Sequence, residues 1–352
     1  MQDMNAAKRL QQALRLVEDL QIHPMGDWPT PAKRLDELSK RTRREIWAKR
    51  DDLSSTQYGG NKVRKLEFLI GEARQRGAKS LVTVGGMGSH QIISTALVGN
   101  QLNLETHALV FRQPATNYVR ENIQLASSLG VHLVPLESPD HLVDAMAQCR
   151  AQQPSYLIPT GGSSATGNLG LVAAAFELRE QIEQRLLPHP KAIFVPAGSG
   201  GTMAGLALGC ALATLDIQVI GVAVANESDI NMEVVQRQIS GITRMLRRRG
   251  AEMCLPDTVT HIELVRAPGS YGETTREASM AIELAHETEG LKLEPTYSAK
   301  AFAQMLGQVG NADFPHPALF WLTCNGRDLQ GLLGSHREPL PALLAEWLEG
   351  NR

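Results

Sequence analysis

The sequence has few cysteines and no excess charge of one sign, and each shortage excludes a class of protein. Its four cysteines, Cys149, Cys210, Cys254 and Cys324, include no CxxC pair. We therefore expect neither a disulfide scaffold nor a zinc ribbon, and a reducing cytoplasm fits. The 35 Lys and Arg residues nearly balance the 37 Asp and Glu residues, for a formal net charge of −2. Without an excess positive field, nucleic acid and anionic membranes are poor candidates for partners.

The sequence also lacks a continuous apolar segment of membrane-spanning type. Its N-terminal RLQQALRLVEDL mixes charged and apolar residues, which predicts an amphipathic helix and no secretion signal. Three stretches without Asp, Glu, Lys or Arg, at 80–104, 151–176 and 192–215, are long enough to cross a bilayer. Each is interrupted by Gly and hydroxyl residues, which would place unsatisfied polar groups in lipid. We therefore expect no membrane span and a cytoplasmic protein.

The same three stretches indicate an α/β fold. Each consists of a short apolar run, a Gly/Ser turn and a helical pattern of small residues, which is typical of a buried parallel strand followed by a helix. Similar runs, alternating with helical segments, are HALVF at 107, VHLVPL at 131, IQVIGVAVA at 217, HIELV at 261 and ALFWLT at 318. The alternation predicts mostly parallel, twisted sheets flanked by helices. Because these units are too numerous for one compact sheet, we expect two domains that share a cleft.

Two segments concentrate charged residues. RTRREIWAKRDD at 41 mixes both signs, and RMLRRRG at 244 is basic. With a nearly neutral total, both are expected to form surface patches, and the second is most simply the solvated face of a helix.

One glycine-rich turn could bind an anion. Segment 198–202, in PAGSGGT, follows the apolar run AIFV and precedes the helical pattern AGLALGCALA; its residues are Gly198, Ser199, Gly200, Gly201 and Thr202. Glycines let successive N–H groups converge on one point, and the helix N-terminus adds a positive dipole, so phosphate is the natural ligand. Tight packing of strand against helix would explain the glycines equally well. The turn is neither GxxxxGK[ST] nor a clean GxGxxG, which disfavours P-loop nucleotidases and dinucleotide dehydrogenases.

A second glycine-containing turn precedes a lysine. In YGGNKVRKLEFLIGEARQRG, Lys62 stands at the start of a helix whose apolar face is formed by Leu66, Leu69, Ile70 and Ala73. The helix dipole and partial burial would disfavour the ammonium form and lower the pKa of Lys62, making its amine able to form an imine. For an arbitrary lysine, a side chain that extends from the helix start into solvent is the simpler interpretation.

The motifs together resemble the pyridoxal-phosphate enzymes of the tryptophan synthase β fold (fold type II), and within them the D-cysteine desulfhydrase and 1-aminocyclopropane-1-carboxylate deaminase family. The similarity runs from WPTPAKRL at 28 to LTCNG, which ends at 326, and GGNK followed by RKLEFL is its most specific part. The other matching segments are GGMGSHQ, IPTGGSSATGNLG, PAGSGGT, APGSYGETT and EPTYSAKAF. The resemblance implies a two-domain α/β enzyme with pyridoxal 5'-phosphate in the inter-domain cleft. It implies a large coenzyme-binding domain at 1–63 and 176–352 and a small domain at 64–175.

The resemblance also assigns roles to residues around the coenzyme. It implies that Lys62 is the Schiff-base lysine, that Asn61 contributes to coenzyme binding, and that segment 198–202 holds the coenzyme phosphate. Tyr271 and Tyr297 match two tyrosines that face the coenzyme in this family, and a buried tyrosine normally finds a hydrogen-bond partner.

Two further groups of residues depart from the family pattern. Ser89, His90 and Gln91 occupy the position of a Ser-Asn-His or Ser-Asn-Gln triplet, where Ser89 and Gln91 would bind the substrate carboxylate. The resemblance implies that Gly162 also contributes to substrate binding. His90 replaces the Asn that binds the phenolic oxygen of the coenzyme; imidazole can donate a hydrogen bond, but it is bulkier and titrates. Thr323 matches the Thr of a His-Thr-Gly-Gly turn and is the candidate partner of the pyridine nitrogen.

The resemblance implies a lyase that acts on a small amino acid such as D-cysteine. The products of α,β-elimination would be a 2-oxo acid, ammonia and the released β-group. Lys62 would act as the base on the α-proton, and a neutral Thr323 would favour departure of the β-substituent over racemisation or transamination. Family members are usually homodimers, and no metal is implied.

Other functions stay open at this point. Cyclopropane ring-opening deamination is the runner-up, but Ser298 stands where the deaminases carry a glutamate. A biosynthetic lyase or replacement enzyme acting on another amino acid is a further alternative. A coenzyme-holding paralogue without catalysis is disfavoured because Lys62, Ser89, Tyr271 and Tyr297 are all present.

Overall fold

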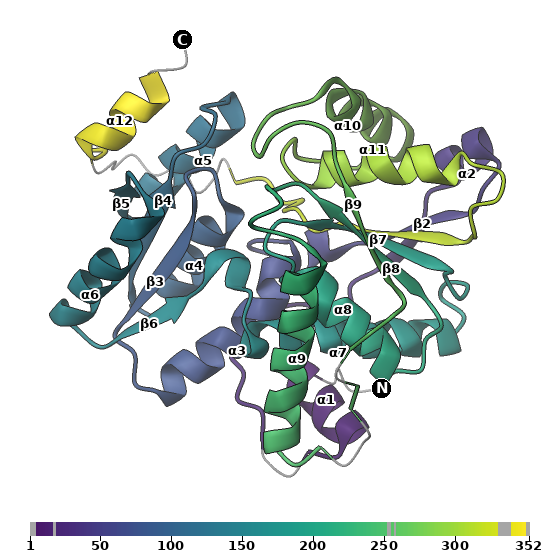
Figure 1. The fold of residues 1–352 in the computed structure, drawn as a ribbon, viewed down its shortest axis with the longest axis horizontal. Coiled ribbons are helices and arrows are strands. Elements are labelled where there is room, and N and C mark those ends of the chain that lie inside the picture. Colours follow the sequence, from purple (N-terminus) through teal and green to yellow (C-terminus); the bar gives the residue numbers. More distant parts are fainter. Residues whose placement is uncertain (1–4, 17–18, 252–254, 257, 330–338, 350–352) are drawn as a thin grey trace. The chain divides into compact units, whose positions relative to one another are not determined.

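The computed structural model contains two compact units, each built around its own sheet (Figure 1). It describes residues 5–16, 19–251, 255–256, 258–329 and 339–349, so that Cys254 lies outside the described residues. Unit 1 comprises Met1–Phe68 and Ser163–Arg327, and unit 2 comprises Leu69–Gly162 and Asp328–Arg352. No helix in these described ranges is both long and apolar enough to cross a membrane. The α/β class with mostly parallel sheets, predicted from the sequence, is confirmed.

Unit 1 contains a six-stranded sheet with the order β1-β2-β10-β7-β8-β9, in which only the edge strand β1 runs antiparallel to its neighbour. The strands are β1 (Ala32–Arg34), β2 (Ile46–Lys49), β7 (Ala192–Ala197), β8 (Gln218–Ala223), β9 (Ile262–Arg266) and β10 (Ala318–Trp321). Every residue of β7 and β10 is buried, as expected for central parallel strands covered on both faces. The apolar runs at 217, 261 and 318 therefore form the strands that they predicted.

Helices cover both faces of this sheet (Figure 1). One face packs against α1 (Ala6–Leu14), α7 (Ala165–Glu183), α8 (Gly201–Leu212) and α9 (Met232–Arg248). The other packs against α2 (Asp36–Thr42), α10 (Arg276–Glu289) and α11 (Ser298–Val309). The first face forms the larger core, which includes the small-residue surfaces of α7 and α8.

Unit 2 contains a four-stranded parallel sheet with the order β5-β4-β3-β6. Its strands are β3 (Ser80–Gly86), β4 (Glu105–Phe111), β5 (His132–Leu136) and β6 (Ser155–Ile158). One face packs against α4 (His90–Gln101), α5 (Asn117–Ser128) and α12 (Ala342–Glu349), and the other against α6 (Leu142–Gln152). Helix α3 (Asn61–Gln75) begins in unit 1 and ends in unit 2.

The two units divide the chain differently from the division at 64 and 175 implied by the family resemblance. The boundary between the units falls after Gly162, so that all of α7 lies in unit 1. Leu169 and Phe176 of this helix belong to the core of unit 1. The C-terminal segment joins unit 2, where Leu344 and Trp347 of α12 pack into the core beside α4 and α5.

The charged segment at 41 is partly buried, and the expectation of a surface patch is wrong for its second half. Lys49 is fully buried and donates to Glu177 at 2.5 Å. Arg64, in the first turn of α3, forms two hydrogen bonds of 2.8 Å with the Asp51 carboxylate and also donates to Glu177. These buried ions compensate one another, and the network joins β2, α3 and α7.

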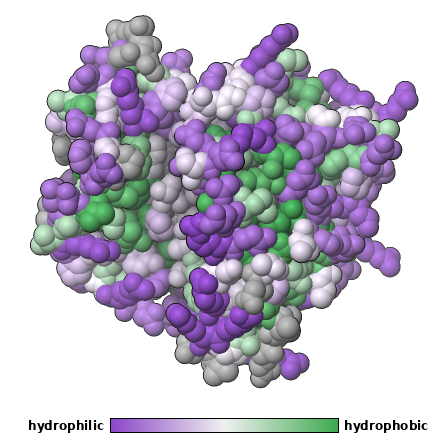
Figure 2. All heavy atoms as spheres, in the orientation of Figure 1, coloured by the Kyte–Doolittle hydropathy of each residue, from purple (hydrophilic) through white to green (hydrophobic). Residues whose placement is uncertain are grey.

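Polar side chains cover much of the face shown in Figure 2. The large hydrophobic side chains that are exposed within the described ranges are Val143, Leu186 and Met280, which lie far apart in the sequence. The basic segment at 244 is a solvated helix face, as predicted, because Arg244, Arg247 and Arg248 are exposed at the end of α9.

Candidate active site

Lys62 is the second residue of α3, as the sequence predicted, and follows a constrained glycine pair. Gly60 has a φ of +108°, and a Cβ atom there would lie 2.8 Å from the main-chain oxygen of Thr323. Burial lowers the pKa of Lys62 to about 8, although the carboxylate of Glu294 opposes this shift. A substantial fraction of the amine is therefore neutral near pH 8, which is the form that attacks a carbonyl carbon.

The turn after β10 is hydrogen-bonded to the segment that precedes Lys62. The main-chain oxygen of buried Thr323 accepts a hydrogen bond from the N–H of Asn61 at 3.1 Å. The side-chain oxygen of Asn325 accepts another from the N–H of Gly59 at 2.8 Å. Thr323 is thus held beside the first turn of α3, in the same unit as Lys62.

Segment 198–202 forms the loop between β7 and α8 that the sequence predicted. Gly200 is the N-cap of α8 with a φ of +80°, and no side chain caps the helix. A Cβ on Gly201 would collide with the side chains of Ser163 and Asn168. Thr202 accepts a hydrogen bond from the Asn61 side chain at 2.8 Å, which ties the start of α8 to the start of α3.

A buried lysine that the sequence analysis did not select adjoins this loop. The Lys65 ammonium donates to the Ser163 hydroxyl at 2.9 Å, and that hydroxyl lies 2.8 Å from the hydroxyl of Ser199. Burial, with the neighbouring Lys62 ammonium, holds the pKa of Lys65 well below its usual value. An ammonium, two hydroxyls and an uncapped helix N-terminus thus adjoin one loop, and this set of donors suits a phosphate group.

Tyr271 and Tyr297, both predicted site residues, share a hydrogen bond. Their hydroxyl oxygens lie 2.6 Å apart, and their rings meet edge to face. Burial is the main cause that raises the pKa of each phenol, so both stay protonated at neutral pH. A Cβ on Gly198 would lie 2.8 Å from the ring of Tyr297, which places this tyrosine directly beside the glycine-rich loop.

Glu294 organises the segment that carries Tyr297. Its buried carboxylate accepts hydrogen bonds from the N–H groups of Thr296, Tyr297 and Ser298 at the start of α11. The hydroxyl of Ser298, where the deaminases have glutamate, accepts from the N–H of Glu294 at 2.8 Å. Ser298 is fully buried, and its hydroxyl stabilises the backbone at the start of α11. On α11, Lys300 donates to the main-chain oxygen of Ser270 and so fastens the loop that carries Tyr271.

In unit 2, Ser89 and His90 stand where β3 leads into α4. Ser89 is the N-cap of α4, and its hydroxyl accepts from the N–H of Gln91 at 3.2 Å. His90 is the first residue of the helix, and its ring centroid lies 5.5 Å from that of Tyr118 on α5. His90 is therefore an aromatic packing partner within unit 2 as well as a polar residue.

The other two predicted substrate-binding residues also lie in unit 2. Gln91 is fully buried; its amide nitrogen donates to Thr95 at 3.0 Å, and its Oε1 has no hydrogen-bond partner among the described residues. Gly162 ends a short 3₁₀ turn, Thr160–Gly162, with a φ of +65° that favours glycine. The structure thus brings Lys62, the glycine-rich loop, the tyrosine pair and Thr323 together in unit 1, and Ser89, His90, Gln91 and Gly162 in unit 2.

Three residues of the candidate site, Lys65, Glu294 and Asn325, were not predicted from the sequence. Lys65 lies three residues after Lys62, so that the helical period places both on neighbouring positions of one face. This spacing is a signal that could have identified Lys65. Glu294 acts through the backbone of its own segment and Asn325 through that of Gly59, and their residue types alone give no such signal.

Comparison with known proteins identifies what the chain is similar to. Residues 24–317 match the family described as "Pyridoxal-phosphate dependent enzyme". The chain is 33% identical over 335 residues to nocardicin C-9' epimerase of Nocardia uniformis subsp. tsuyamanensis, an alignment that covers 93% of this chain and 98% of that protein. It is 34% identical over 308 residues to D-cysteine desulfhydrase of Salmonella paratyphi B, covering 83% and 90%.

A solved structure, described as that of an ACC deaminase homologue, superimposes with a TM-score of 0.78. That comparison covers 90% of this chain and 94% of the other, at 28% sequence identity. The similarity therefore extends over both units and is not confined to the glycine-rich loop.

Proposed function

The chain belongs to the pyridoxal-phosphate dependent enzymes, and from this premise we propose that it catalyses α,β-elimination from a small amino acid such as D-cysteine. The products are a 2-oxo acid, ammonia and the released β-group. The observation that carries the proposal is the cluster around Lys62, a lysine with a pKa of about 8 beside a phosphate-type loop and a tyrosine pair. The similarity to D-cysteine desulfhydrase supports the choice of substrate.

The residues present fit the coenzyme. The loop at 198–202 has no space for a Cβ on Gly198 or Gly201, and hydroxyl and ammonium donors adjoin it. We assign the coenzyme phosphate to this loop, with Lys65 as its ammonium partner. We assign the pyridine nitrogen to Thr323 and the phenolic oxygen to His90, with Asn61 supporting the start of α8 through Thr202.

When bound, pyridoxal phosphate supplies the electron sink that stabilises negative charge at the α-carbon of the substrate. Lys62 would hold the coenzyme, and its Nζ would accept the α-proton of the substrate. Tyr271 and Tyr297 are kept protonated by burial, so they can donate a proton to the departing β-group. Ser89, with the N-terminus of α4 behind it, binds the substrate carboxylate.

Gln91 and Gly162 complete the proposed substrate site. Gln91 lies in the first turn of α4, and Gly162 ends the short 3₁₀ turn Thr160–Gly162. One amide hydrogen of Gln91 stays available after the bond to Thr95. Ring-opening deamination is less well supported. The hydroxyl of Ser298 accepts a hydrogen bond from the backbone N–H of Glu294, and this residue supplies no carboxylate at the position where the deaminases have glutamate.

A second candidate is epimerisation at the α-carbon. It is favoured by the similarity to nocardicin C-9' epimerase, which covers 98% of that protein. In this reaction the α-proton removed by Lys62 is replaced on the opposite face of the substrate, and the hydroxyl of the tyrosine pair would be the donor. No β-group leaves, and no ammonia is released.

A product assay distinguishes the two candidates. Purified, coenzyme-loaded protein is incubated with D-cysteine, L-cysteine, β-chloroalanine and 1-aminocyclopropane-1-carboxylate. Elimination predicts equal amounts of sulfide, pyruvate and ammonia from D-cysteine, with no inverted cysteine. Inversion without pyruvate would support the epimerase, and formation of 2-oxobutyrate from the cyclopropane amino acid would support the deaminase.

We further propose that the enzyme is a cytoplasmic homodimer. Its buried cysteines, Cys149, Cys210 and Cys324, form no disulfide with one another and suit a reducing compartment. Light scattering of the purified protein should give twice the mass of one chain, and a monomer mass would contradict the dimer.

A further inference from the structure

We propose that Glu105, His107 and His132 form a binding site for a divalent transition-metal ion of the zinc class, separate from the proposed catalytic residues. Glu105 and His107 lie at the amino-terminal end of β4, and His132 begins β5. Ser89, in contrast, follows the carboxyl end of the parallel strand β3. The cluster therefore lies at the amino-terminal ends of the parallel strands, and Ser89 of the proposed substrate site follows a carboxyl-terminal end.

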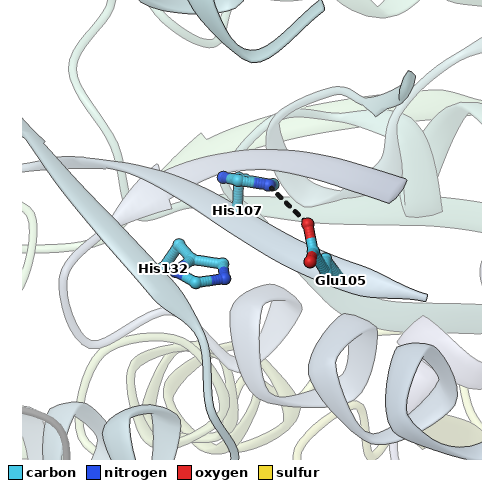
Figure 3. A group of neighbouring side chains, drawn as sticks. All are labelled: Glu105, His107 and His132. Atoms are coloured by element: carbon cyan, nitrogen blue, oxygen red, sulfur yellow. Dashed lines mark ion pairs between the residues drawn. The ribbon is translucent and has the colours of Figure 1, made fainter. Parts of the chain in front are cut away.

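The sheet register brings the three side chains together. His107 and His132 are paired residues on adjacent parallel strands, and their rings stack with centroids 4.8 Å apart. Glu105 precedes His107 by two residues, so that both side chains point to the same face of the sheet. One potential ligand atom from each residue lies within 4.8 Å of the others. Figure 3 shows the three groups gathered on two neighbouring strands.

His107 is the second observation that points to a ligand. Its side chain is only 9% exposed, and its Nε2 atom has no hydrogen-bond partner in the described part of the chain. The Oε2 atom of Glu105 lies 3.8 Å from it, which is beyond hydrogen-bond distance (Figure 3). A buried polar atom without a partner carries a desolvation cost, and a bound cation at this nitrogen would remove it.

The residue types of the cluster suit a metal, because imidazole nitrogens and carboxylate oxygens are common zinc ligands. Two imidazoles and one carboxylate are a ligand set that zinc accepts, with a fourth position left for water or an external ligand.

Only small side-chain movements are needed to bring the three ligand atoms to metal-binding distance. Bonds of about 2.1 Å in a tetrahedral site place the ligand atoms about 3.4 Å apart, somewhat closer than they lie here. His132 and Glu105 are exposed and can adjust. The Oε2 atom of Glu105, which is the oxygen near His107, accepts a hydrogen bond from Gln153 at 2.6 Å and keeps a second lone pair for the metal. An ion held in this way would link β4 to the edge strand β5 and stabilise unit 2.

The test is a calorimetric titration of the full, coenzyme-loaded chain with zinc chloride. We expect the unsubstituted protein to bind one equivalent, and the exposed-residue variants His132→Gln and Glu105→Gln to bind more weakly. Because His132 is a direct ligand, its loss should weaken binding by more than about 100-fold, the upper end for loss of an outer-shell partner. Zinc should also raise the melting temperature of the unsubstituted protein and not that of His132→Gln.

The control is His261→Gln. His261 and Asp216 form an exposed His-carboxylate pair with an Nδ1–Oδ1 distance of 3.2 Å, but no third ligand joins them in the described ranges. This variant should bind zinc as the unsubstituted protein does. Unchanged zinc affinity in His132→Gln or Glu105→Gln, loss of binding in His261→Gln, or no binding by the unsubstituted protein would each overturn the site. None of these results affects the proposed elimination reaction.

Discussion

The side-chain oxygen of Asn325 accepts a hydrogen bond of 2.8 Å from the N–H of Gly59. Asn325 stands where the resembled His-Thr-Gly-Gly turn has glycine, so this chain has a contact that the family pattern does not supply. The bond joins the turn that carries Thr323 to the segment that carries Lys62. It links the proposed partner of the pyridine nitrogen to the residue that would hold the coenzyme.

Asn325→Ala should therefore weaken both stability and coenzyme binding. Leaving the buried N–H of Gly59 without a partner costs about 1–3 kcal/mol, which urea unfolding of the apoprotein can measure. Asn325→Asp keeps an acceptor oxygen and should retain most of the coenzyme affinity. If Asn325→Ala binds the coenzyme as well as the unsubstituted protein does, the turn does not depend on this bond.

Lys65→Met should weaken binding of pyridoxal phosphate much more than binding of pyridoxal. The two ligands differ only in the phosphate, and Lys65 adjoins the loop assigned to that group through Ser163 and Ser199. Loss of a charge-assisted hydrogen bond costs about 1.5–3 kcal/mol, or roughly a 10- to 100-fold loss of affinity. Equal losses for both ligands, measured by fluorescence titration of the apoprotein, would show that Lys65 is structural.

The rate of coenzyme uptake by the apoprotein should rise with pH through about 8 and then level off. The neutral amine of Lys62 is the nucleophile, and raising the pH through its pKa of about 8 increases the neutral fraction. Glu294→Gln should move the midpoint to lower pH, because the carboxylate stabilises the ammonium form and raises this pKa. Stopped-flow absorbance can record both profiles. Substitution of the exposed Glu287, Glu287→Gln, is the control. An unchanged midpoint in Glu294→Gln would contradict the effect of Glu294 on the pKa of Lys62.

Glu177→Gln should destabilise unit 1 severely. It leaves the buried charges of Lys49 and Arg64 without one of their compensating partners, and breaking such a network costs about 3–5 kcal/mol. Glu183→Gln, on the same helix, disrupts an exposed ion pair with Arg179 and should cost less than about 1 kcal/mol. Chemical unfolding of both variants measures their free energies of unfolding. Similar losses of stability in the two would mean that the buried network contributes little to the stability of unit 1.

Much of the fold was predictable because its strands are buried on both faces. Apolar runs followed by Gly/Ser turns identified β3, β6 and β7, apolar runs alternating with helical segments identified β8 and β10, and the first pattern placed segment 198–202 at the start of a helix. The position of Lys62 was likewise fixed by local features, a glycine pair and an amphipathic helix. These signals lie within about a dozen residues of the feature that they predict.

The rest depends on residues that the fold brings together from distant parts of the chain. Lys49 and Glu177 are 128 residues apart, and Lys65 and Ser163 are 98 residues apart. Local hydropathy marks a charged segment as exposed, which is why the burial of Lys49 was not predicted. The pairing of His107 with His132 depends on strand register, which becomes visible only once β4 and β5 are aligned.

The central claim is that Lys62 holds the coenzyme, and chemical trapping tests it most directly. Holoenzyme is reduced with borohydride, digested and mapped by mass spectrometry to locate the pyridoxyl group. We expect one modified residue, Lys62, and a Lys62→Ala variant that loses both the label and the visible absorption of the bound coenzyme. A pyridoxyl group on Lys65 or any other lysine of the unsubstituted protein would contradict it.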